Sequence, residues 1–223
     1  MGAVLSELPS REEYLHQWSA LHGGAATTGL VGRWIGGAYR VARPLARLGA
    51  GPDAVTLVGL VVGLGAAAAA VPASRGWTAV AVALVVASGV LDNLDGAVAL
   101  LTGRATRRGF VLDSVCDRLT DAAYCAALWF AGAPGALAVA GGGIAWLHEY
   151  TRARAAVAGM PEVGVVTVSE RPTRVIITAV FLLGAVLYPS AATRWATMGA
   201  AAWVTVGLIG AVQLAVTVGR RLR

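Results

Sequence analysis

Six apolar segments, separated from one another by short polar stretches, constrain the fold of this chain more than any other feature. They lie at residues 55–71, 77–90, 110–131, 136–150, 175–187 and 195–218, and the second and fourth extend into the polar residues that follow them. A helix needs roughly 20 predominantly apolar residues to cross a bilayer. Charged residues make up only 13% of the chain, whereas soluble domains contain about 25%. We therefore predict an all-α integral membrane protein with six transmembrane helices.

The N-terminal residues 1–50 differ from this pattern and form a predicted cytoplasmic segment ahead of a transmembrane catalytic domain at 51–223. A short helix is expected at residues 11–21. In residues 28–49, apolar side chains recur at helical spacing and four arginines supply charge, namely Arg33, Arg40, Arg43 and Arg47. That mixture predicts an amphipathic helix lying in the membrane interface. A solvated linker helix is the alternative.

The distribution of arginines predicts the topology. All 18 basic residues are arginines, and most lie before the first span, between spans two and three, between spans four and five, or after span six. Cytoplasmic loops carry the excess of positive charge, so both termini are predicted to be cytoplasmic. Because the arginines lie beside apolar spans, they indicate anionic membrane lipid as the partner and not nucleic acid.

Five aspartates lie in one stretch of thirty residues that runs from the end of the second predicted span into the third: Asp92, Asp95, Asp113, Asp117 and Asp121. Ionisable side chains in membrane segments are costly and usually functional. Spacings of three and four place each group on one helix face, and a short loop near Gly103 would bring the two faces together. Carboxylate oxygens suit Mg²⁺ or Mn²⁺. The alternative is that these acids cap helix ends and pair with nearby arginines.

The segment from Asp92 to Asp117 resembles the signature of the CDP-alcohol phosphatidyltransferases, D-x2-D-G-x2-A-R-x8-G-x3-D-x3-D. The signature positions that match are Asp92, Asp95, Gly96, Ala99, Gly109, Asp113 and Asp117. Leu100 stands where the signature has arginine. Pro52-Asp53-x-x-Thr56 resembles a further element of the family, P-N/D-x-x-T. Other elements resemble the bacterial members that make phosphatidylinositol phosphate: Thr106-Arg107, Asp117-Arg118-x-x-Asp121, Tyr150-x-x-x-Arg154 and Glu170-Arg171-Pro172-Thr173-Arg174.

The resemblance implies a role for each matching residue. One divalent ion, Mg²⁺ or Mn²⁺, would be held by Asp92, Asp95 and Asp113, and a second by Asp92, Asp113 and Asp117. Asp117 would also be the general base. The CDP site would be lined by Asp53, Thr56, Gly96, Ala99 and Gly109. Arg104, one helical turn beyond Leu100, is our candidate for the charge that the signature arginine supplies elsewhere.

The resemblance also implies the reaction. A phosphatidyl group would move from CDP-diacylglycerol to a phosphorylated polyol, with inositol 1-phosphate favoured, and CMP would leave. Arginine suits forked binding of phosphate, and the candidates for the acceptor site are Arg107, Arg154, Arg171 and Arg174. Anchoring of the membrane topology is the alternative role for these arginines. A homodimer in the bacterial cell membrane is expected.

Three other functions remain open at the level of sequence. Glycerol 3-phosphate is a possible acceptor, since it also needs a phosphate pocket. A catalytically silent member of the family is favoured by Leu100 and opposed by the intact acids. A metal-ion transporter would need acids near the bilayer midplane, whereas Asp92 and Asp113 lie close to arginine-rich loops.

Overall fold

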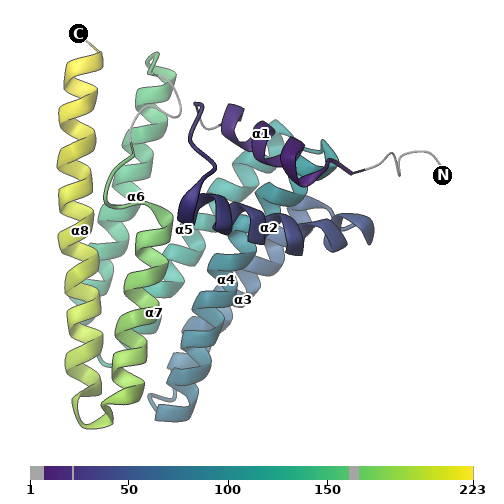
Figure 1. Cartoon of the computed structure of the whole chain (residues 1–223). Helices are drawn as coiled ribbons and strands as arrows, with labels where there is room; N and C mark the ends of the chain where they lie inside the picture. The colour runs from purple at the N-terminus through teal and green to yellow at the C-terminus, as the bar shows by residue number, and fades with distance from the viewer. Residues whose placement is uncertain (1–7, 22, 161–165, 223) are drawn as a thin grey trace. The chain divides into compact units, whose positions relative to one another are not determined.

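Helices account for all the regular secondary structure in the part of the chain that the computed structural model describes, which is residues 8–21, 23–160 and 166–222. The helices follow the predicted segments closely (Figure 1). In chain order they are α1 (Arg11–Leu21), α2 (Gly29–Arg47), α3 (Pro52–Ala70), α4 (Arg75–Thr102), α5 (Arg107–Phe130), α6 (Gly135–Val157), α7 (Arg171–Leu187), the short 3-10 helix η1 (Pro189–Ala191) and α8 (Ala192–Arg221).

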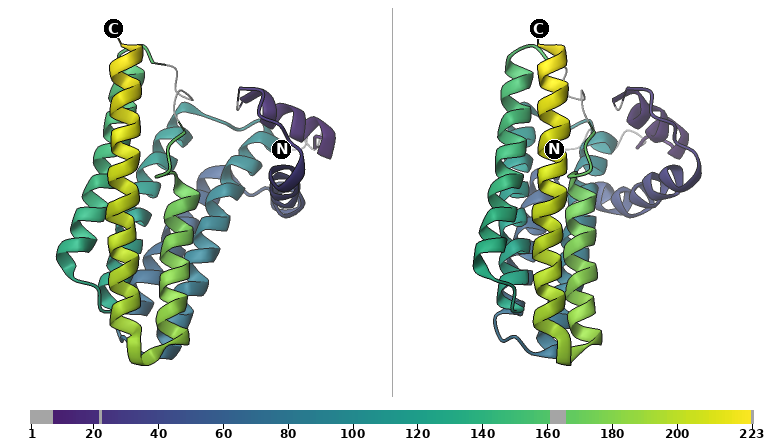
Figure 2. Two further views of the ribbon diagram at one scale, coloured as in Figure 1. Left: turned by 60° about the vertical axis from the view of Figure 1, so that its left-hand side comes forward. Right: turned by 90° about the vertical axis from the view of Figure 1, so that its left-hand side faces the viewer.

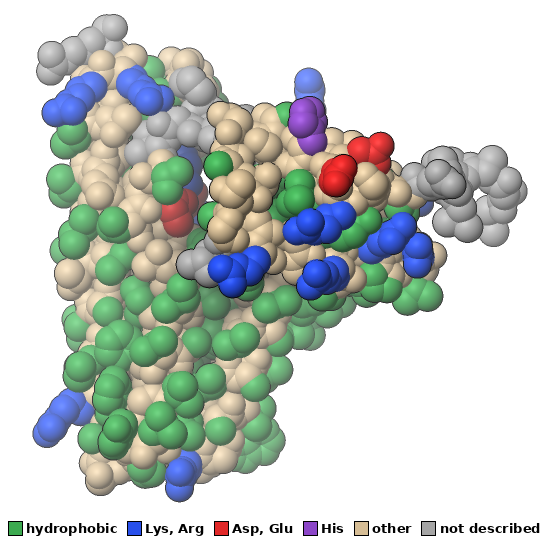
Figure 3. All heavy atoms as spheres, in the orientation of Figure 1, with side chains coloured by type: hydrophobic (Ala, Val, Ile, Leu, Met, Phe, Trp, Pro, Cys, Tyr) green, Lys and Arg blue, Asp and Glu red, His purple; other side chains and the backbone are tan. Residues whose placement is uncertain are grey.

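Three stretches are long and apolar enough to cross a membrane: Pro52–Ala70, Arg75–Thr102 and Pro189–Arg221. Large apolar side chains are exposed on their surfaces, among them Val61, Val86 and Val212. Figure 3 shows hydrophobic side chains covering the long helices on the face in view. Exposed apolar surface of this extent is unusual in water and is what lipid contact requires. The structure is therefore an all-helical protein with at least these three membrane-spanning candidates.

The chain divides into two compact units. The first contains the described residues up to Gly59 together with Val90–Cys116, and the second contains Leu60–Gly89 and the described residues from Asp117 onward. Helices α3, α4 and α5 contribute residues to both units. The predicted division into a cytoplasmic segment (1–50) and a transmembrane domain (51–223) concerns position relative to a membrane, and it stays a prediction. Residues 1–7 of the cytoplasmic segment lie outside the described part of the chain.

The first unit packs α1 and α2 around a small apolar core. Helix α1 begins with a capping box, in which the Ser10 amide donates to Glu13 Oε2 (2.7 Å) and the Glu13 amide donates to Ser10 Oγ (3.2 Å). Tyr14 of α1 is buried against Tyr39 of α2, with ring centroids 5.4 Å apart. The core continues to the C-terminal part of α4, where Val98 is fully buried.

The turn between α4 and α5 has the geometry that a short loop near Gly103 predicts. Gly103 has a φ of +62°, which glycine adopts without steric cost, and the Arg104 amide donates to the Ala99 carbonyl (3.1 Å). Thr106 then caps α5, because its Oγ1 accepts from the Gly109 amide at 2.9 Å. This turn fixes the positions of Arg104 and Gly109 in the first unit.

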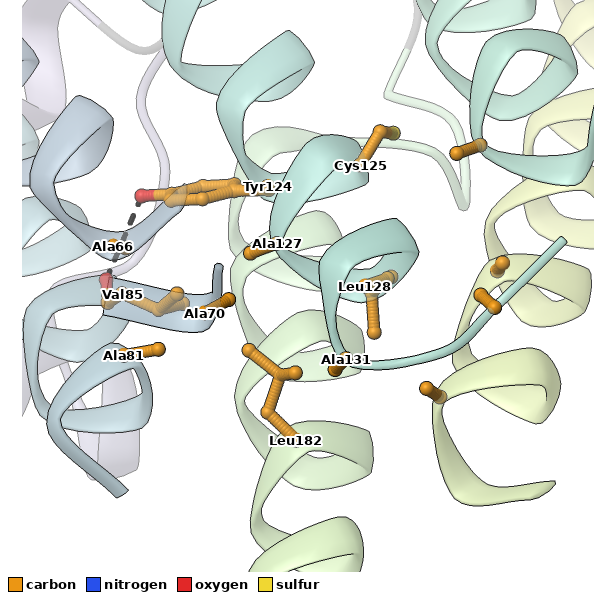
Figure 4. Close-up of a cluster of buried hydrophobic side chains, with 14 of the residues drawn as sticks. Ala66, Ala70, Ala81, Val85, Tyr124, Cys125, Ala127, Leu128, Ala131 and Leu182 are labelled. Atoms are coloured by element: carbon orange, nitrogen blue, oxygen red, sulfur yellow. Dashed lines mark hydrogen bonds between the residues drawn. The ribbon is translucent and has the colours of Figure 1, made fainter. Parts of the chain in front are cut away.

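In the second unit, α7 and α8 form a hairpin through η1, and α6 lies against α8 (Figure 2). The core is drawn in Figure 4, where Tyr124 and Leu128 of α5 lie among side chains of the other helices and the Tyr124 hydroxyl donates to the Val85 carbonyl (3.5 Å). Small residues permit the close packing. A Cβ at Gly199 of α8 would lie 2.7 Å from Phe181 Cβ of α7, closer than packed side chains allow.

Candidate active site

A pocket of about 170 Å³ in the first unit is the place where most of the predicted substrate residues meet. It lies between the start of α3, the C-terminal part of α4, the turn after α4 and the start of α5. All six residues expected to contact the nucleotide line it, namely Asp53, Thr56, Gly96, Ala99, Arg104 and Gly109. Asp53 and Thr56 of α3 thus lie in one cavity with residues of α4 and α5 that follow them by 39 or more positions in the sequence.

Two of the predicted metal ligands, Asp95 and Asp113, also line this pocket. Asp95 is only 6% exposed. Its Oδ2 accepts a hydrogen bond of 2.7 Å from Thr56 Oγ1, and its Oδ1 accepts one of 2.6 Å from the Gly96 amide. Because a buried carboxylate needs such donors, Thr56 fixes the orientation of Asp95 in the pocket wall.

The glycines of the pocket leave room in different ways. A Cβ at Gly109 would lie 3.1 Å from both Asp53 Oδ1 and Thr106 Oγ1, so glycine lets these side chains approach the backbone of α5. Around Gly96, by contrast, a Cβ would meet no atom within 4 Å. A side chain there would extend into the pocket itself.

The positive charge of the pocket comes from Arg104 and not from the signature position. Arg104 is the one cation among the residues that line the pocket. Leu100 is partly buried and packs against the apolar core formed with α1 and α2. The Leu100 side chain therefore contributes to the core, and the positive charge lies four residues later, in the turn after α4.

The acids of α4 and α5 approach one another as predicted. Carboxylate oxygens of Asp92 and Asp113 lie within 4.8 Å of each other, and Asp117 follows Asp113 by one turn on α5. Two carboxylates this close could both ligate one divalent cation such as Mg²⁺ once their side chains close in on it. Asp95 is outside this close group, since its oxygens are engaged by Thr56 and Gly96.

In the second unit, Asp117 lies beside an arginine of α7. Arg171 donates from Nη1 to the Asp117 carbonyl (2.8 Å), and its Nη2 lies 3.1 Å from Asp117 Oδ1. Arg118 is 3.5 Å from Asp117 Oδ2. The carboxylate proposed as the base is thus held between two guanidinium groups and remains 19% exposed.

The four arginines predicted for the acceptor site have different environments. Arg171 and Arg174 both contact Asp121, at 3.1 and 2.7 Å. Arg174 is almost fully buried, at 2% exposure, whereas Arg154 is exposed on α6. Arg107 is exposed at the start of α5 and belongs to the first unit. The second unit therefore brings Arg171 and Arg174 together, and Arg154 does not join them.

The segment that leads into α7 is tied to its neighbours by hydrogen bonds. Arg152 donates to Glu170 Oε1 (2.6 Å), the Thr167 amide donates to the same oxygen (2.8 Å), and the Val168 amide donates to Gln213 Oε1 (2.9 Å). Burial alone would raise the pKa of Glu170, but the hydrogen bonds from Arg152 and Thr167 outweigh burial and lower the pKa below its ordinary value. Glu170 is therefore a carboxylate near neutral pH and anchors the start of α7.

Sequence reasoning missed the roles of two acids. Asp121 is grouped by spacing with the metal-binding aspartates, yet it is fully buried between Arg171 and Arg174 and lies outside the close acid group. Glu149 has no assigned role among the predicted site residues, and it lies 3.3 Å from Arg118 and 3.4 Å from Arg174. The signal that could have found both is an acid inside an apolar segment that has arginines within reach on other helices.

Comparisons with known proteins show which family this sequence is similar to. The sequence profile of the CDP-alcohol phosphatidyltransferase family matches residues 50–219. A phosphatidylinositol phosphate synthase from Mycobacteroides abscessus is 34% identical over 190 residues, which cover 82% of this chain and 80% of that protein. An archaetidylinositol phosphate synthase from Aeropyrum pernix is 38% identical over 172 residues, covering 74% of this chain and 84% of that protein.

Solved structures of a similar protein have a similar fold. The apo crystal structure of Mycobacterium tuberculosis phosphatidylinositol phosphate synthase superposes with a TM-score of 0.63 at 31% identity, covering 81% of this chain and 95% of that one. The crystal structure of the same synthase with CDP-DAG bound gives a TM-score of 0.59 at 29% identity, covering 79% of this chain and 92% of that one.

Proposed function

This chain is an enzyme of the CDP-alcohol phosphatidyltransferase family, and we propose that it transfers a phosphatidyl group from CDP-diacylglycerol to inositol 1-phosphate and releases CMP. The observation that carries the proposal is the pocket of the first unit, which is lined by every residue expected to contact the nucleotide. The relatives named as inositol phosphate synthases support the choice of acceptor.

The nucleotide would occupy the pocket between α3, α4 and α5. Arg104 would contact the pyrophosphate, because it is the one cation among the lining residues. The absence of a side chain at Gly96 leaves space for the ligand beside α4. Asp53, Thr56, Ala99 and Gly109 would complete the walls.

The donor set fits a divalent cation, since oxygens of Asp92 and Asp113 lie within 4.8 Å of each other and carboxylates are the ligands that Mg²⁺ and Mn²⁺ favour. The full set that we propose, for two ions, is Asp92, Asp95, Asp113 and Asp117. Bound there, the metal would offset negative charge on the pyrophosphate and make CMP a better leaving group.

The chain's own residues would supply the base and the acceptor site. Asp117 would remove the proton from the acceptor hydroxyl, whose oxygen then bonds to the lipid-bearing phosphorus as the bond from that phosphorus to CMP breaks. Arg171 fixes the orientation of this carboxylate through its contact at 3.1 Å. For the acceptor phosphate we propose Arg107, Arg154, Arg171 and Arg174, among which Arg174, at 2% exposure, would act from behind Arg171 and not by direct contact.

We also propose the membrane arrangement that the sequence predicts: six spanning helices, α3 to α8, with both termini in the cytoplasm of a bacterial cell. Helix α2 would lie in the interface. Its buried stripe faces the core, and a second stripe exposes apolar side chains, namely Val31, Trp34 and Val41, followed by Leu48 just after the helix. A third stripe exposes the charged residues Arg33, Arg40 and Arg47. A helix with separate apolar and cationic exposed stripes suits the boundary between acyl chains and anionic headgroups.

We further expect a homodimer, since small residues in the spans allow helices of two copies to pack closely. Light scattering of the protein in detergent, corrected for bound detergent, would report a mass of about two chains if this is right. A mass of one chain at all protein concentrations would contradict it.

The proposed reaction is tested by measuring CMP release from CDP-diacylglycerol with purified protein. Parallel assays contain Mg²⁺ or Mn²⁺ and one of inositol 1-phosphate, glycerol 3-phosphate, free inositol or serine. We expect release with inositol 1-phosphate alone, loss of release with a chelator, and loss in Asp117→Asn. Release with glycerol 3-phosphate in its place would identify the other acceptor. No release with any acceptor, from protein that still binds Mn²⁺, would mean a catalytically silent protein with Leu100 as the first suspect.

A further inference from the structure

Six charged side chains of the second unit alternate in sign and form a closed ring of ion pairs. They come from α5, α6 and α7, and each contacts two neighbours of opposite charge. The contacts around the ring are Asp117–Arg171 (3.1 Å), Arg171–Asp121 (3.1 Å), Asp121–Arg174 (2.7 Å), Arg174–Glu149 (3.4 Å), Glu149–Arg118 (3.3 Å) and Arg118–Asp117 (3.5 Å). Arg118 makes one further contact across the ring, since its Nη2 lies 3.5 Å from Asp121 Oδ2.

The ring is buried on one side and accessible on the other. The side chains of Asp121 and Arg174 are 0% and 2% exposed. Those of Arg171, Arg118 and Asp117 are 14%, 17% and 19% exposed. The exposed side of the ring therefore comprises the base, its two flanking guanidinium groups and Glu149, which is 22% exposed, and Asp121 and Arg174 form the support behind them.

Stability alone is a poor reason for the buried half. Desolvation of a buried ion pair often outweighs its Coulomb attraction, and apolar residues of similar volume are frequently as stable or more so. The core of the same unit is built from alanine, leucine and other apolar side chains. A buried Asp121–Arg174 pair beside the base is better explained by a need for fixed charge at this position.

Asp121 acts on the base through Arg171. Its two oxygens accept from different arginines, Oδ1 from Arg171 and Oδ2 from Arg174. Arg171 is thereby held at three points, because the same guanidinium also contacts the carbonyl and the carboxylate of Asp117. Glu149 holds the opposite side of the ring through Arg118 and Arg174.

We propose that Asp121 and Glu149 are positioning residues, which hold the two accessible guanidinium groups of the ring, those of Arg171 and Arg118, ready to receive the phosphate of the acceptor beside the base. The proposal rests on the proposed function. The side chains of Arg171 and Arg118 are 14% and 17% exposed, so an incoming dianion can reach their guanidinium groups. Cations fixed in advance bind phosphate without losing side-chain entropy at that moment.

Kinetics of Asp121→Asn, which keeps the shape and removes the charge, test the proposal. We expect the KM for inositol 1-phosphate to rise on the order of 10- to 100-fold, as for loss of charge-assisted hydrogen bonds, with a lower kcat. The KM for CDP-diacylglycerol should stay within about twofold, because the nucleotide pocket is a separate set of residues. Glu149→Gln should have the same selective effect, but smaller, because its contacts are longer.

A matched control separates positioning from general stability. Trp203→Phe removes the buried hydrogen bond from Trp203 Nε1 to Thr178 Oγ1 (3.0 Å) in the same unit, a bond in which no side chain of the ring takes part. It should lower the Tm and leave both KM values near those of the wild type.

Each outcome of these assays decides the inference. Unchanged acceptor KM in Asp121→Asn, or equal rises in both KM values, would overturn the proposal. If Asp121→Asn does not fold, the more exposed Glu149→Gln decides by the same criterion. Failure of the proposed function can be distinguished from failure of this inference, because in the former case the wild-type protein would release no CMP with inositol 1-phosphate.

Discussion

Replacement of Gly96 by alanine should make the protein more stable and less active. Gly96 lies inside α4, where glycine destabilises a helix by roughly 0.5–1 kcal/mol relative to alanine. A Cβ there meets no protein atom within 4 Å, so nothing offsets this gain. The same methyl group would extend into a pocket of about 170 Å³. We therefore expect a higher free energy of unfolding together with a KM for CDP-diacylglycerol that is raised about tenfold, the effect of about 1.4 kcal/mol.

The assay pairs thermal unfolding in detergent with CMP-release kinetics, and Gly143→Ala is the control. Gly143 is also an exposed glycine inside a helix, α6, with no atom within 4 Å of an added Cβ, but it does not line the pocket. The Gly143→Ala protein should gain a similar free energy of unfolding and keep the wild-type KM and kcat. A stabilised Gly96→Ala protein with an unchanged KM for CDP-diacylglycerol would refute the assignment of this pocket to the nucleotide.

Three further predictions follow from the contacts of single residues. Thr56→Val removes a buried hydrogen bond to Asp95 and should lower the free energy of unfolding by about 1–3 kcal/mol; chemical denaturation in detergent measures this, and an unchanged midpoint would contradict it. Arg104→Ala should raise the KM for CDP-diacylglycerol about tenfold or more, and adding Leu100→Arg should restore part of the loss; no recovery would count against exchange of the charge between these positions. Glu170 has a lowered pKa, so its contribution to stability is present above its ordinary pKa of 4.5 and is lost as the pH falls through the lower folded-state value. The Tm of Glu170→Gln should therefore fall less steeply with acidification than the Tm of the wild type, and parallel plots of Tm against pH for the two proteins would contradict this.

The positions of the helices were predictable because local signals and apolar patterning agree. Residues 11–21 form α1 as expected, and the Ser10–Glu13 capping box is visible in the sequence. The reversal near Gly103 follows from a glycine between two apolar segments. The approach of Asp92 to Asp113 follows from helical spacing on two consecutive helices. Each of these features depends on contacts between neighbouring parts of the chain.

The ring of ion pairs was not predictable, because it joins α5, α6 and α7 through tertiary contacts. Spacing alone assigns Asp121 to the acids of α5 and cannot reveal that Arg174 reaches it from 53 residues away. The burial of Arg174 could not be predicted either, because arginines near a predicted span are also expected as exposed residues that anchor the membrane topology. The bond that engages Asp95 with Thr56 also depends on the packing of α3 against α4.

The identity of the lipid product tests the central claim most directly. Purified protein in vesicles would receive CDP-diacylglycerol, inositol 1-phosphate and Mg²⁺, and the lipids and nucleotides would be measured by mass spectrometry. Our account predicts phosphatidylinositol phosphate and CMP in equal amounts, with neither formed by Asp117→Asn. CMP accompanied by phosphatidic acid, the product of attack by water, or no product from a folded protein that binds Mn²⁺ would contradict it.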